Sequence, residues 1–267
     1  MFLSVIVPTF NRNDLLLKCL NALSPDNQTI DQSCYEVIVS DDSISAQARQ
    51  LSPDFPWVRF VDGPKKGPAA NRNNGAKQAK GDWLVFIDDD CIPDKAILQT
   101  YFNEIILGKY QALEGLIDAE RPQERFDEES PLNLNGGCFW SCNIAVSQKL
   151  FKNINGFDEG FPFAAMEDVD LYSRIKEVTN SKFLREAKVI HPWRSVKPFR
   201  NFKKRILSHR YILKKNNVKK GFNYRFKRFK LFIGQTLTDI AQLHKFSYRG
   251  AGVFFDRLCF HFVMLFV

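Results

Sequence analysis

Three consecutive aspartates, Asp88, Asp89 and Asp90, are the residues of this chain with the clearest capacity for chemistry. They follow an apolar run, 83–87, whose composition predicts a buried β-strand. Adjacent carboxylates repel one another unless a cation lies among them. Because hard divalent cations prefer such oxygen ligands, the sequence indicates a metal site. The alternative is a solvated acidic turn in which Asp90 caps a following helix.

Strand-like apolar runs alternate with helical patterns along the first part of the chain. Predicted strands cover residues 3–10, 35–40, 57–61 and 83–87, and predicted helices cover 13–23 and 69–80. Alternation at this spacing predicts an α/β fold with a mostly parallel sheet and helices on both faces. In such sheets, ligands bind at the carboxyl ends of the strands, where the acidic cluster lies.

Two other predicted strands also end in polar residues that suit a ligand site. Thr9 ends the first strand, and Asp41 and Asp42 follow the second. Each of these residues has a structural alternative as the cap of a following helix. The carboxyl ends of parallel strands meet at one edge, however, and a shared site explains all of them together.

The second part of the chain adds three candidates. A helical pattern that starts at Glu167 places Glu167 and Asp168 in its first turn, where the helix dipole favours anions. A stabilising role is the alternative to catalysis here. We expect the same dipole to keep Asp168 ionised and to lower its basicity. The predicted strand 183–190 leads into His191, although a lone histidine is more often a core or surface residue than a ligand.

The remaining elements of this part are less regular. A helix is predicted at 94–107 and strands at 111–117 and 138–146. The segment 118–137 is polar and has no periodicity. A loop of this length inside a compact domain is typical of a lid or binding loop, or else of a disordered segment.

Length and composition indicate one large α/β domain with an appendage. The chain has 267 residues, of which 45% are apolar. Its six cysteines lack the paired spacing of a metal site, so we expect reduced thiols in a cytosolic protein. The first residues lead into an apolar segment without a basic stretch or a cleavage site, and we expect no signal peptide.

The charge of the chain is unevenly distributed. Residues 197–267 contain 17 Lys and Arg against 2 Asp and Glu, whereas residues 1–196 contain 21 against 28. A basic segment on an acidic body indicates a polyanionic partner, either nucleic acid or anionic lipid. Helices are predicted at 195–216 and 231–243. The mostly apolar run 253–267 is too short to span a membrane and is predicted to lie at its interface.

Three interpretations of this basic segment stay open. Its helices could bind an anionic membrane peripherally, pack on the rest of the protein with a solvated basic face, or bind single-stranded nucleic acid. Basic residues interleaved with aromatic ones suit the last of these. No nucleic-acid-binding motif accompanies them in the sequence, so nucleic acid is the least favoured partner.

Six sequence motifs follow one another in a distinctive order. They are Val5-Ile-Val-Pro-Thr-Phe-Asn11, Val37-Ile-Val-Ser-Asp-Asp-Ser43, Gly67-Pro-Ala-Ala-Asn-Arg-Asn-Asn-Gly75, Phe86-Ile-Asp-Asp-Asp-Cys-Ile-Pro93, Asn143-Ile-Ala-Val146, and Gly156-Phe-Asp-Glu159 with Glu167-Asp-Val-Asp-Leu171. In order and spacing they resemble the family 2 glycosyltransferases. The resemblance covers about residues 1–195 and implies a GT-A fold, with a nucleotide-binding half at 1–92 and an acceptor-binding half at 93–195. Residues 196–267 then form a basic helical extension.

The resemblance also implies a role for each candidate residue. Thr9 and Asp42 would contact the nucleoside, Arg72 the base or diphosphate, and Asp88 the ribose. The donor-binding residues implied are Thr9, Asp42, Arg72, Asp88 and Asp89. The metal ligands implied are Asp90 and His191, for Mn²⁺ or Mg²⁺. The catalytic base implied is Asp168, and the acceptor-binding residues implied are Trp140, Asn143 and Glu167.

The implied activity is inverting, metal-dependent transfer of a sugar from a UDP-, GDP- or dTDP-sugar to a hydroxyl of a glycan or lipid-linked acceptor. Such transfer would serve polysaccharide, glycolipid or other glycoconjugate synthesis. A metal stabilises the leaving diphosphate, and a carboxylate takes the proton of the attacking hydroxyl. The expected location is the cytoplasm, peripheral at the inner face of the cell membrane.

Two rival functions were weighed against this one. A nucleotidyltransferase also uses carboxylates at strand ends and a metal, but it would normally carry a Gly-rich basic loop where this chain has Pro8-Thr-Phe-Asn-Arg12. A nucleotide-sugar-binding protein without transfer activity is the other rival. The presence of both the implied metal ligands and the implied base disfavours it.

Overall fold

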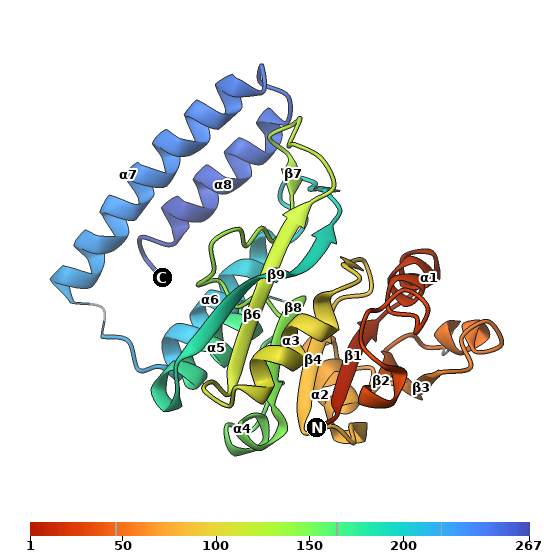
Figure 1. Ribbon diagram of the computed structural model, residues 1–267. Coiled ribbons are helices and arrows are strands. Elements are labelled where there is room, and N and C mark those ends of the chain that lie inside the picture. The colour runs from red at the N-terminus through yellow and green to blue at the C-terminus, as the bar shows by residue number, and fades with distance from the viewer. Residues whose placement is uncertain (46, 164, 220) are drawn as a thin grey trace. The chain divides into compact units, whose positions relative to one another are not determined.

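The computed structural model describes residues 1–45, 47–163, 165–219 and 221–267 (Figure 1). The chain divides into two compact units, which are described separately. Unit 1 comprises Met1–Glu120, Pro131–Gly160 and Glu167–Pro192, and unit 2 comprises Arg121–Ser130, Phe161–Met166 and Trp193–Val267. Two segments of the loops in the expected acceptor-binding half, 121–130 and 161–166, therefore belong to unit 2.

Unit 1 is built on a mixed, mostly parallel sheet with the strand order β3-β2-β1-β4-β8-β6-β9-β5 among its described residues. The strands are β1 (Leu3–Thr9), β2 (Tyr35–Asp41), β3 (Val58–Asp62), β4 (Trp83–Ile87), β5 (Ile92–Pro93), β6 (Ala112–Ala119), β8 (Asn143–Ser147) and β9 (Ser181–His191). β1 to β4 are parallel, as are β6 and β9, whereas β8 and β5 run antiparallel to their neighbours.

Helices cover both faces of this sheet. They are α1 (Asn13–Ala22), α2 (Pro68–Gln78), α3 (Ile97–Ile106), α4 (Gln148–Asn153) and α5 (Glu167–Val178), with short 3₁₀ turns η1 (Gln32–Cys34) and η2 (Gln47–Leu51). α1 and α3 pack on one face, and α2, α4 and α5 pack on the other. The predicted α/β class, with a mostly parallel sheet flanked by helices, is confirmed.

The central strands show why their sequences are continuously apolar. In β4, Val85 and Ile87 belong to one core cluster, whereas Leu84 and Phe86 belong to the cluster on the opposite face. Successive side chains of a strand point to opposite faces, so a strand covered on both faces must be apolar at every position. The carboxylates that follow β4 therefore emerge directly from the centre of the core.

One predicted strand is shorter than expected. The sequence predicts a strand over 138–146, but β8 begins only at Asn143. The buried carboxylate of Glu114 accepts hydrogen bonds from the backbone N–H groups of Gly137 and Phe139, at 2.7 and 2.9 Å. Because these backbone groups bond to a side chain instead of a neighbouring strand, the segment before Asn143 folds as a loop. Phe139 itself has a positive φ of 52°, which a strand excludes.

Unit 2 contains the helices α6 (Phe202–Lys215), α7 (Phe222–Lys245) and α8 (Ala251–Val263), together with the paired short strands β7 (Glu128–Glu129) and β10 (Arg194–Ser195). Within this unit α7 and α8 lie side by side (Figure 1). Phe126, Leu243, Phe246 and Val253 form one apolar cluster. Phe260, Met264 and Val267 form a second. The unit thus has a core of its own.

The apolar run 253–267 contributes to this core more than the sequence predicts. Val253, Phe260 and Met264 are at most 8% exposed, whereas Phe255 and Phe262 are more than half exposed. Only the exposed face of α8 is therefore available for the predicted contact with a membrane interface. No helix among the described residues is both long enough and apolar enough to cross a membrane.

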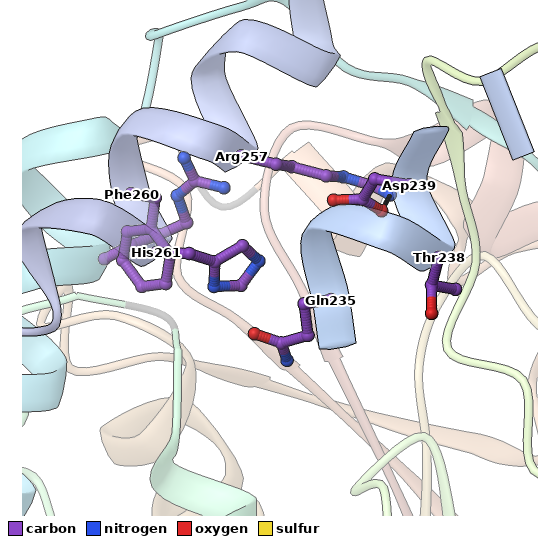
Figure 2. A pocket seen from close by; sticks show the side chains of 7 residues that line it. Gln235, Thr238, Asp239, Arg257, Phe260 and His261 are labelled. Atoms are coloured by element: carbon purple, nitrogen blue, oxygen red, sulfur yellow. Dashed lines mark hydrogen bonds and ion pairs between the residues drawn. The ribbon is translucent and has the colours of Figure 1, made fainter. Parts of the chain in front are cut away.

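A cavity of about 320 Å³ lies between α6, α7 and α8 of unit 2 (Figure 2). Arg205, Phe260 and His261 line one part of it, and α7 contributes Gln235, Thr238 and Asp239. Burial lowers the pKa of His261, so this imidazole is neutral at pH 7. The guanidinium groups of the cavity are held by carboxylates of the same unit.

Candidate active site

The carboxyl ends of β1, β2 and β4 meet at one edge of the sheet because these strands are parallel neighbours. Thr9 pairs in register with Asp41. Its backbone oxygen accepts a hydrogen bond from the N–H of Asp42 at 2.9 Å, and its hydroxyl donates to Asp89 at 2.7 Å. The structure therefore brings the predicted residues at these three strand ends together.

Arg12 neutralises the buried part of the acidic cluster. Its guanidinium lies 2.9 Å from a carboxylate oxygen of Asp89 and 3.1 Å from one of Asp90. The two aspartate side chains are at most 1% exposed, whereas that of Arg12 is 38% exposed. Buried carboxylates require such a partner, because an uncompensated buried charge costs several kcal/mol. The sequence analysis missed this role, although a basic residue soon after the end of β1 was the available signal.

The predicted donor-binding role of Asp89 stays a prediction. Asp89 is wholly buried, and its carboxylate is bonded to Thr9 and Arg12. These contacts hold the end of β1 to the residues that follow β4. Thr9 is 3% exposed and donates its hydroxyl to Asp89, and its side chain belongs to the same buried contact.

Asp90 and His191 form the centre of the candidate metal site. His191 ends β9, and its Nε2 lies 3.4 Å from a carboxylate oxygen of Asp90. Its Nδ1 lies 2.8 Å from the backbone oxygen of Pro192, to which the Nδ1–H tautomer donates. Burial lowers the pKa of His191, so the ring is neutral at pH 7. A neutral imidazole with its Nδ1 held in this way presents Nε2 as a ligand.

Cys91 lies beside this pair without suiting the same role. Asp90, Cys91 and His191 each offer a ligand atom, and these atoms lie within 4.8 Å of one another. The side chain of Cys142, together with burial, raises the pKa of Cys91 well above its ordinary value. Its sulfur is a soft ligand, which Mn²⁺ and Mg²⁺ favour less than oxygen or nitrogen. The oxygen of Asp90 and the nitrogen of His191 are the donors that fit Mn²⁺ or Mg²⁺.

Arg72 connects the strand-end aspartates to α5. It lies on α2, and its guanidinium contacts Asp88 at 2.6 Å and Glu167 at 3.4 Å. Burial opposes its charge, but the carboxylates of Asp88 and Glu167 outweigh this effect and raise the pKa of Arg72. The structure thus brings three predicted residues together: the buried guanidinium of Arg72 contacts the carboxylates of both Asp88 and Glu167.

Asp42 holds the loop that leads into α2. Its two carboxylate oxygens accept hydrogen bonds from the backbone N–H groups of Lys65 and Gly67. Gly67 precedes α2 with a φ of 94°, a conformation that favours glycine, and Pro68 occupies the first helical position. Each carboxylate oxygen has a second lone pair, so these bonds leave Asp42 able to accept from a ligand as well.

Asp168 and Glu167 lie in the first turn of α5, as the sequence predicts. Burial raises the pKa of both carboxyl groups, and nearby Arg72 opposes this shift without cancelling it. The expected loss of basicity at the helix terminus is therefore wrong for Asp168. Desolvation outweighs the helix dipole and makes this carboxylate a stronger base than an exposed aspartate.

Asn143 and Trp140, two of the predicted acceptor contacts, differ in the burial of their side chains. Asn143 is fully buried, accepts a hydrogen bond from Tyr101 at 2.7 Å and donates to the backbone oxygens of Leu116 and Ala187. These bonds occupy its amide, and the contact of Asn143 with an acceptor stays a prediction. Trp140 is only partly buried and packs on the edge of the core.

Asn73 is a further residue that the sequence analysis missed. Its side chain donates to the backbone oxygen of Phe157 at 2.8 Å and to Glu159 at 2.9 Å, and it accepts from the N–H of Phe157 at 3.0 Å. These bonds attach the Gly156–Glu159 turn to α2. Periodicity gives no signal for such a contact, since the partners are more than 80 residues apart.

Comparison with known proteins agrees with this geometry. Residues 4–169 match the model of glycosyl transferase family 2, and the chain belongs to this family. It is 32% identical over 144 residues to a poly(ribitol-phosphate) β-glucosyltransferase of Bacillus spizizenii, which covers 49% of this chain and 22% of that protein. It is 29% identical over 172 residues to the glycosyltransferase AglE of Haloferax volcanii, covering 61% of this chain and 56% of AglE.

A third relative is the GalNAc(5)-diNAcBac-PP-undecaprenol β-1,3-glucosyltransferase of Campylobacter jejuni, with 40% identity over 94 residues, 33% of this chain and 29% of that enzyme. The chain thus spans from about a fifth to just over half of these relatives' lengths. Among solved structures, the 1–349 fragment of S. aureus TarS in complex with UDP matches with a TM-score of 0.58 and 23% identity, over 80% of this chain and 66% of that one. This match shows the GT-A fold of the chain.

Replacing Arg12 tests the electrostatic role of its guanidinium. We expect Arg12→Met, measured by urea unfolding with EDTA present, to lower the free energy of unfolding by about 1–3 kcal/mol, because it leaves Asp89 and Asp90 uncompensated. The matched control is Arg49→Met, whose pair with Asp62 is more than half exposed on both sides and is worth less than about 1 kcal/mol. Equal losses in the two variants would contradict the assignment.

Proposed function

We propose that unit 1 transfers a sugar from a nucleoside-diphosphate donor to an acceptor hydroxyl, with inversion and with help from a divalent metal. Membership of glycosyl transferase family 2 supports the class of reaction. The observation that carries the proposal is the placement of Asp90 against His191, at 3.4 Å, beside the aspartates at the ends of two parallel strands. A shared ligand site would explain why residues so far apart in sequence meet there.

The donor in this proposal is a uridine nucleotide sugar. TarS, which shares the fold, has been solved with UDP and with UDP-GlcNAc. In this chain Asp42 would accept a hydrogen bond from the base, and Asp88 would accept from the ribose. Arg72 is held by Asp88 and Glu167 and would place its positive charge near the diphosphate.

Asp90 and His191 would hold Mn²⁺ or Mg²⁺ in the proposed reaction. Their oxygen and neutral nitrogen suit either ion. When bound, the metal supplies Lewis-acid stabilisation of the leaving diphosphate. Arg12, which already contacts Asp90, keeps the carboxylate oriented.

Asp168 is the proposed general base. It would take the proton of the acceptor hydroxyl as that oxygen attacks the sugar from the face opposite the diphosphate, and a single displacement of this kind inverts the anomeric carbon. Burial raises the pKa of Asp168 and so strengthens it as a base. Trp140, Asn143 and Glu167 are the proposed acceptor contacts, and Asn143 also donates to the backbone oxygens of Leu116 and Ala187.

We further propose that residues 196–267 bind an anionic membrane surface, where a lipid-linked acceptor would be found. Residues 197–267 contain 17 basic and 2 acidic side chains, which supports an anionic partner. The name of the C. jejuni relative specifies an undecaprenol-linked acceptor, which supports a lipid-linked one here. The location proposed is the inner face of the cell membrane.

Asp168→Asn tests the general base. We expect nearly unchanged UDP affinity and a turnover lowered by about 10²–10⁴-fold, because the amide cannot take the proton. Glu177→Gln, an exposed change on the same helix, is the control and should leave turnover unchanged. Turnover of Asp168→Asn within a few-fold of the wild type would exclude this residue as the base. If the wild type bound UDP-sugar but neither transferred the sugar nor slowly released UDP, the protein would instead be a binding protein.

The same assignment predicts a pH dependence. A base acts in its ionised form. The kcat is therefore at its maximum above the pKa of the base and falls as the pH drops through that pKa. Because burial raises the pKa of Asp168, the acidic limb of the kcat profile should lie above the value of about 3.9 for an exposed aspartate. Profiles of kcat between pH 4 and pH 8 measure it. A kcat that stays constant down to pH 4 would contradict the raised pKa of Asp168.

Metal removal tests the role of Asp90 and His191. We expect EDTA to abolish transfer, Mn²⁺ to restore it, and Mn²⁺ to tighten UDP binding in the wild type but not in Asp90→Asn or His191→Ala. Cys91→Ser is the matched control inside the cluster, and because sulfur is a poor ligand for Mn²⁺ this variant should keep the Mn²⁺ effect. UDP affinity that is the same with and without Mn²⁺ in the wild type would remove this part of the proposal.

Vesicle flotation tests the membrane partner. At low salt the protein should float more strongly with vesicles of phosphatidylglycerol than with vesicles of phosphatidylcholine, because only the former are anionic. A protein that stays at the bottom with both kinds of vesicle, at every salt concentration, is not a membrane binder.

A further inference from the structure

The longest helix of unit 2 exposes a continuous apolar stripe. On α7 six large apolar side chains follow one another at intervals of three or four residues, which places them on one face of the helix. Their exposed fractions lie between 42% for Ile233 and 81% for Phe222. We call them the α7 stripe: Phe222, Phe226, Phe229, Ile233, Leu237 and Ile240.

The stripe is not the face by which α7 packs into its unit. That packing is made by Asp239 and Leu243, which are buried, and Leu243 belongs to the cluster formed with Phe126 and Val253. α7 is therefore anchored through one face while a second face presents its apolar residues to the outside. Apolar patches of this extent on a protein surface mark a binding site for another surface.

The charges around the stripe are of one sign. Exposed Arg225, Lys227 and Lys230 lie on α7 itself, and the Nζ of Lys230 lies 4.6 Å from the ring centre of Phe226. Long basic side chains beside apolar ones can reach phosphate groups while the apolar ones are inserted below them. A partner with phosphate groups at its surface and an apolar region below them suits both the basic and the apolar residues.

The two acidic residues of 197–267 do not oppose this charge. Asp239 is 8% exposed and lies 3.3 Å from Arg257, and Figure 2 shows the two side chains turned toward each other. Asp256 is 2% exposed and accepts from Arg205 at 2.7 Å. Both carboxylates are thus buried within unit 2, and the surface around the stripe is cationic.

These observations favour a bilayer over a second copy of the chain. A dimer through the stripe would bring Arg225, Lys227 and Lys230 of one copy against the same cations of the other, which is unfavourable. A membrane offers phosphate to the cations and acyl chains to the phenylalanines. From Phe222 to Ile240 the stripe covers 19 residues, roughly 27 Å along the helix axis. This length, with aromatic residues on one side and basic residues beside them, is typical of a helix that lies in the plane of the interface.

α8 and the residues that follow it also expose aromatic side chains. Phe255, Phe262 and Phe266 are 57%, 53% and 75% exposed. The rings of Phe232 on α7 and Phe262 on α8 lie 6.3 Å apart, so the two helices meet through aromatic residues. α7 thus presents the stripe as part of a helix pair with its own core and not as an isolated helix.

We propose that α7 lies in the headgroup region of an anionic bilayer with the α7 stripe inserted among the acyl chains. The inference rests on the membrane association proposed above, and it adds that binding is by insertion and not only by electrostatic adsorption. Adsorption is lost when salt screens the charges, since the Debye length falls to about 3 Å at 1 M salt. Insertion is not screened, so part of the binding should survive.

The experiment is flotation of the full chain with phosphatidylglycerol vesicles at low salt and at 1 M NaCl. The test variant is Phe226→Gln/Phe229→Gln/Ile233→Gln, and the control is Ile106→Gln/Leu107→Gln/Val178→Gln, which removes exposed apolar residues from unit 1. Wild type and control should stay bound at 1 M NaCl. The test variant should still adsorb at low salt. Its partition coefficient at 1 M NaCl should fall by about 100-fold, because the variant loses the favourable free energy of inserting two or more partly buried apolar side chains.

Two complementary measurements separate the possible outcomes. Lys227→Gln/Lys230→Gln should weaken binding at low salt and leave the salt-resistant part intact, and circular dichroism should show wild-type helix content in every variant.

Equal binding of test variant and wild type at both salt concentrations would overturn insertion and leave membrane association standing. A wild-type dimer that the test variant converts to a monomer in solution would assign the stripe to a second copy. Absence of wild-type binding at low salt would overturn both proposals.

Discussion

The burial of negative charge at the carboxyl end of β4 is the constraint on which the architecture of unit 1 depends. Asp89 and Asp90 follow a strand covered on both faces, so their carboxylates emerge where water has little access. Ionised groups in such a place require compensating charge. Arg12 from the turn after β1 supplies this charge to Asp90, and Arg72 from α2 supplies it to Asp88. The neutral imidazole of His191, at the end of β9, also reaches Asp90. Elements from most of unit 1 are thereby tied to one edge of the sheet.

A site built in this way combines stability with reactivity. Arg72 bridges Asp88 and Glu167, and so joins the edge formed by β1, β2 and β4 to the helix that carries Asp168. The burial that makes these pairs necessary also raises the pKa of Asp168, which helps a base that must take a proton near neutral pH. The same desolvation that costs folding energy thus prepares the carboxylate for the proposed chemistry.

Much of this arrangement could be predicted from the sequence, and the reason lies in local patterns. Alternating strands and helices predict the sheet, and the rule that ligands bind at strand ends predicts the meeting of Thr9, Asp42 and the acidic cluster. Contacts that depend on packing gave no such signal. The saturation of Asn143 by Tyr101 and two backbone oxygens, and the loop held by Glu114, follow from three-dimensional neighbours that periodicity cannot identify. The exposed stripe of α7 was also missed, because an apolar helical face in a sequence ordinarily predicts a buried one.

Electron paramagnetic resonance of bound Mn²⁺ tests the central claim most directly. The chain has four histidines, so ¹⁵N-histidine labelling gives a nitrogen signal that can be assigned by substitution. With Mn²⁺ and UDP present, the account predicts a hyperfine coupling from one histidine nitrogen that disappears in His191→Ala and persists in His209→Ala. Mn²⁺ that binds with UDP and shows no coupling to a histidine nitrogen would contradict the account.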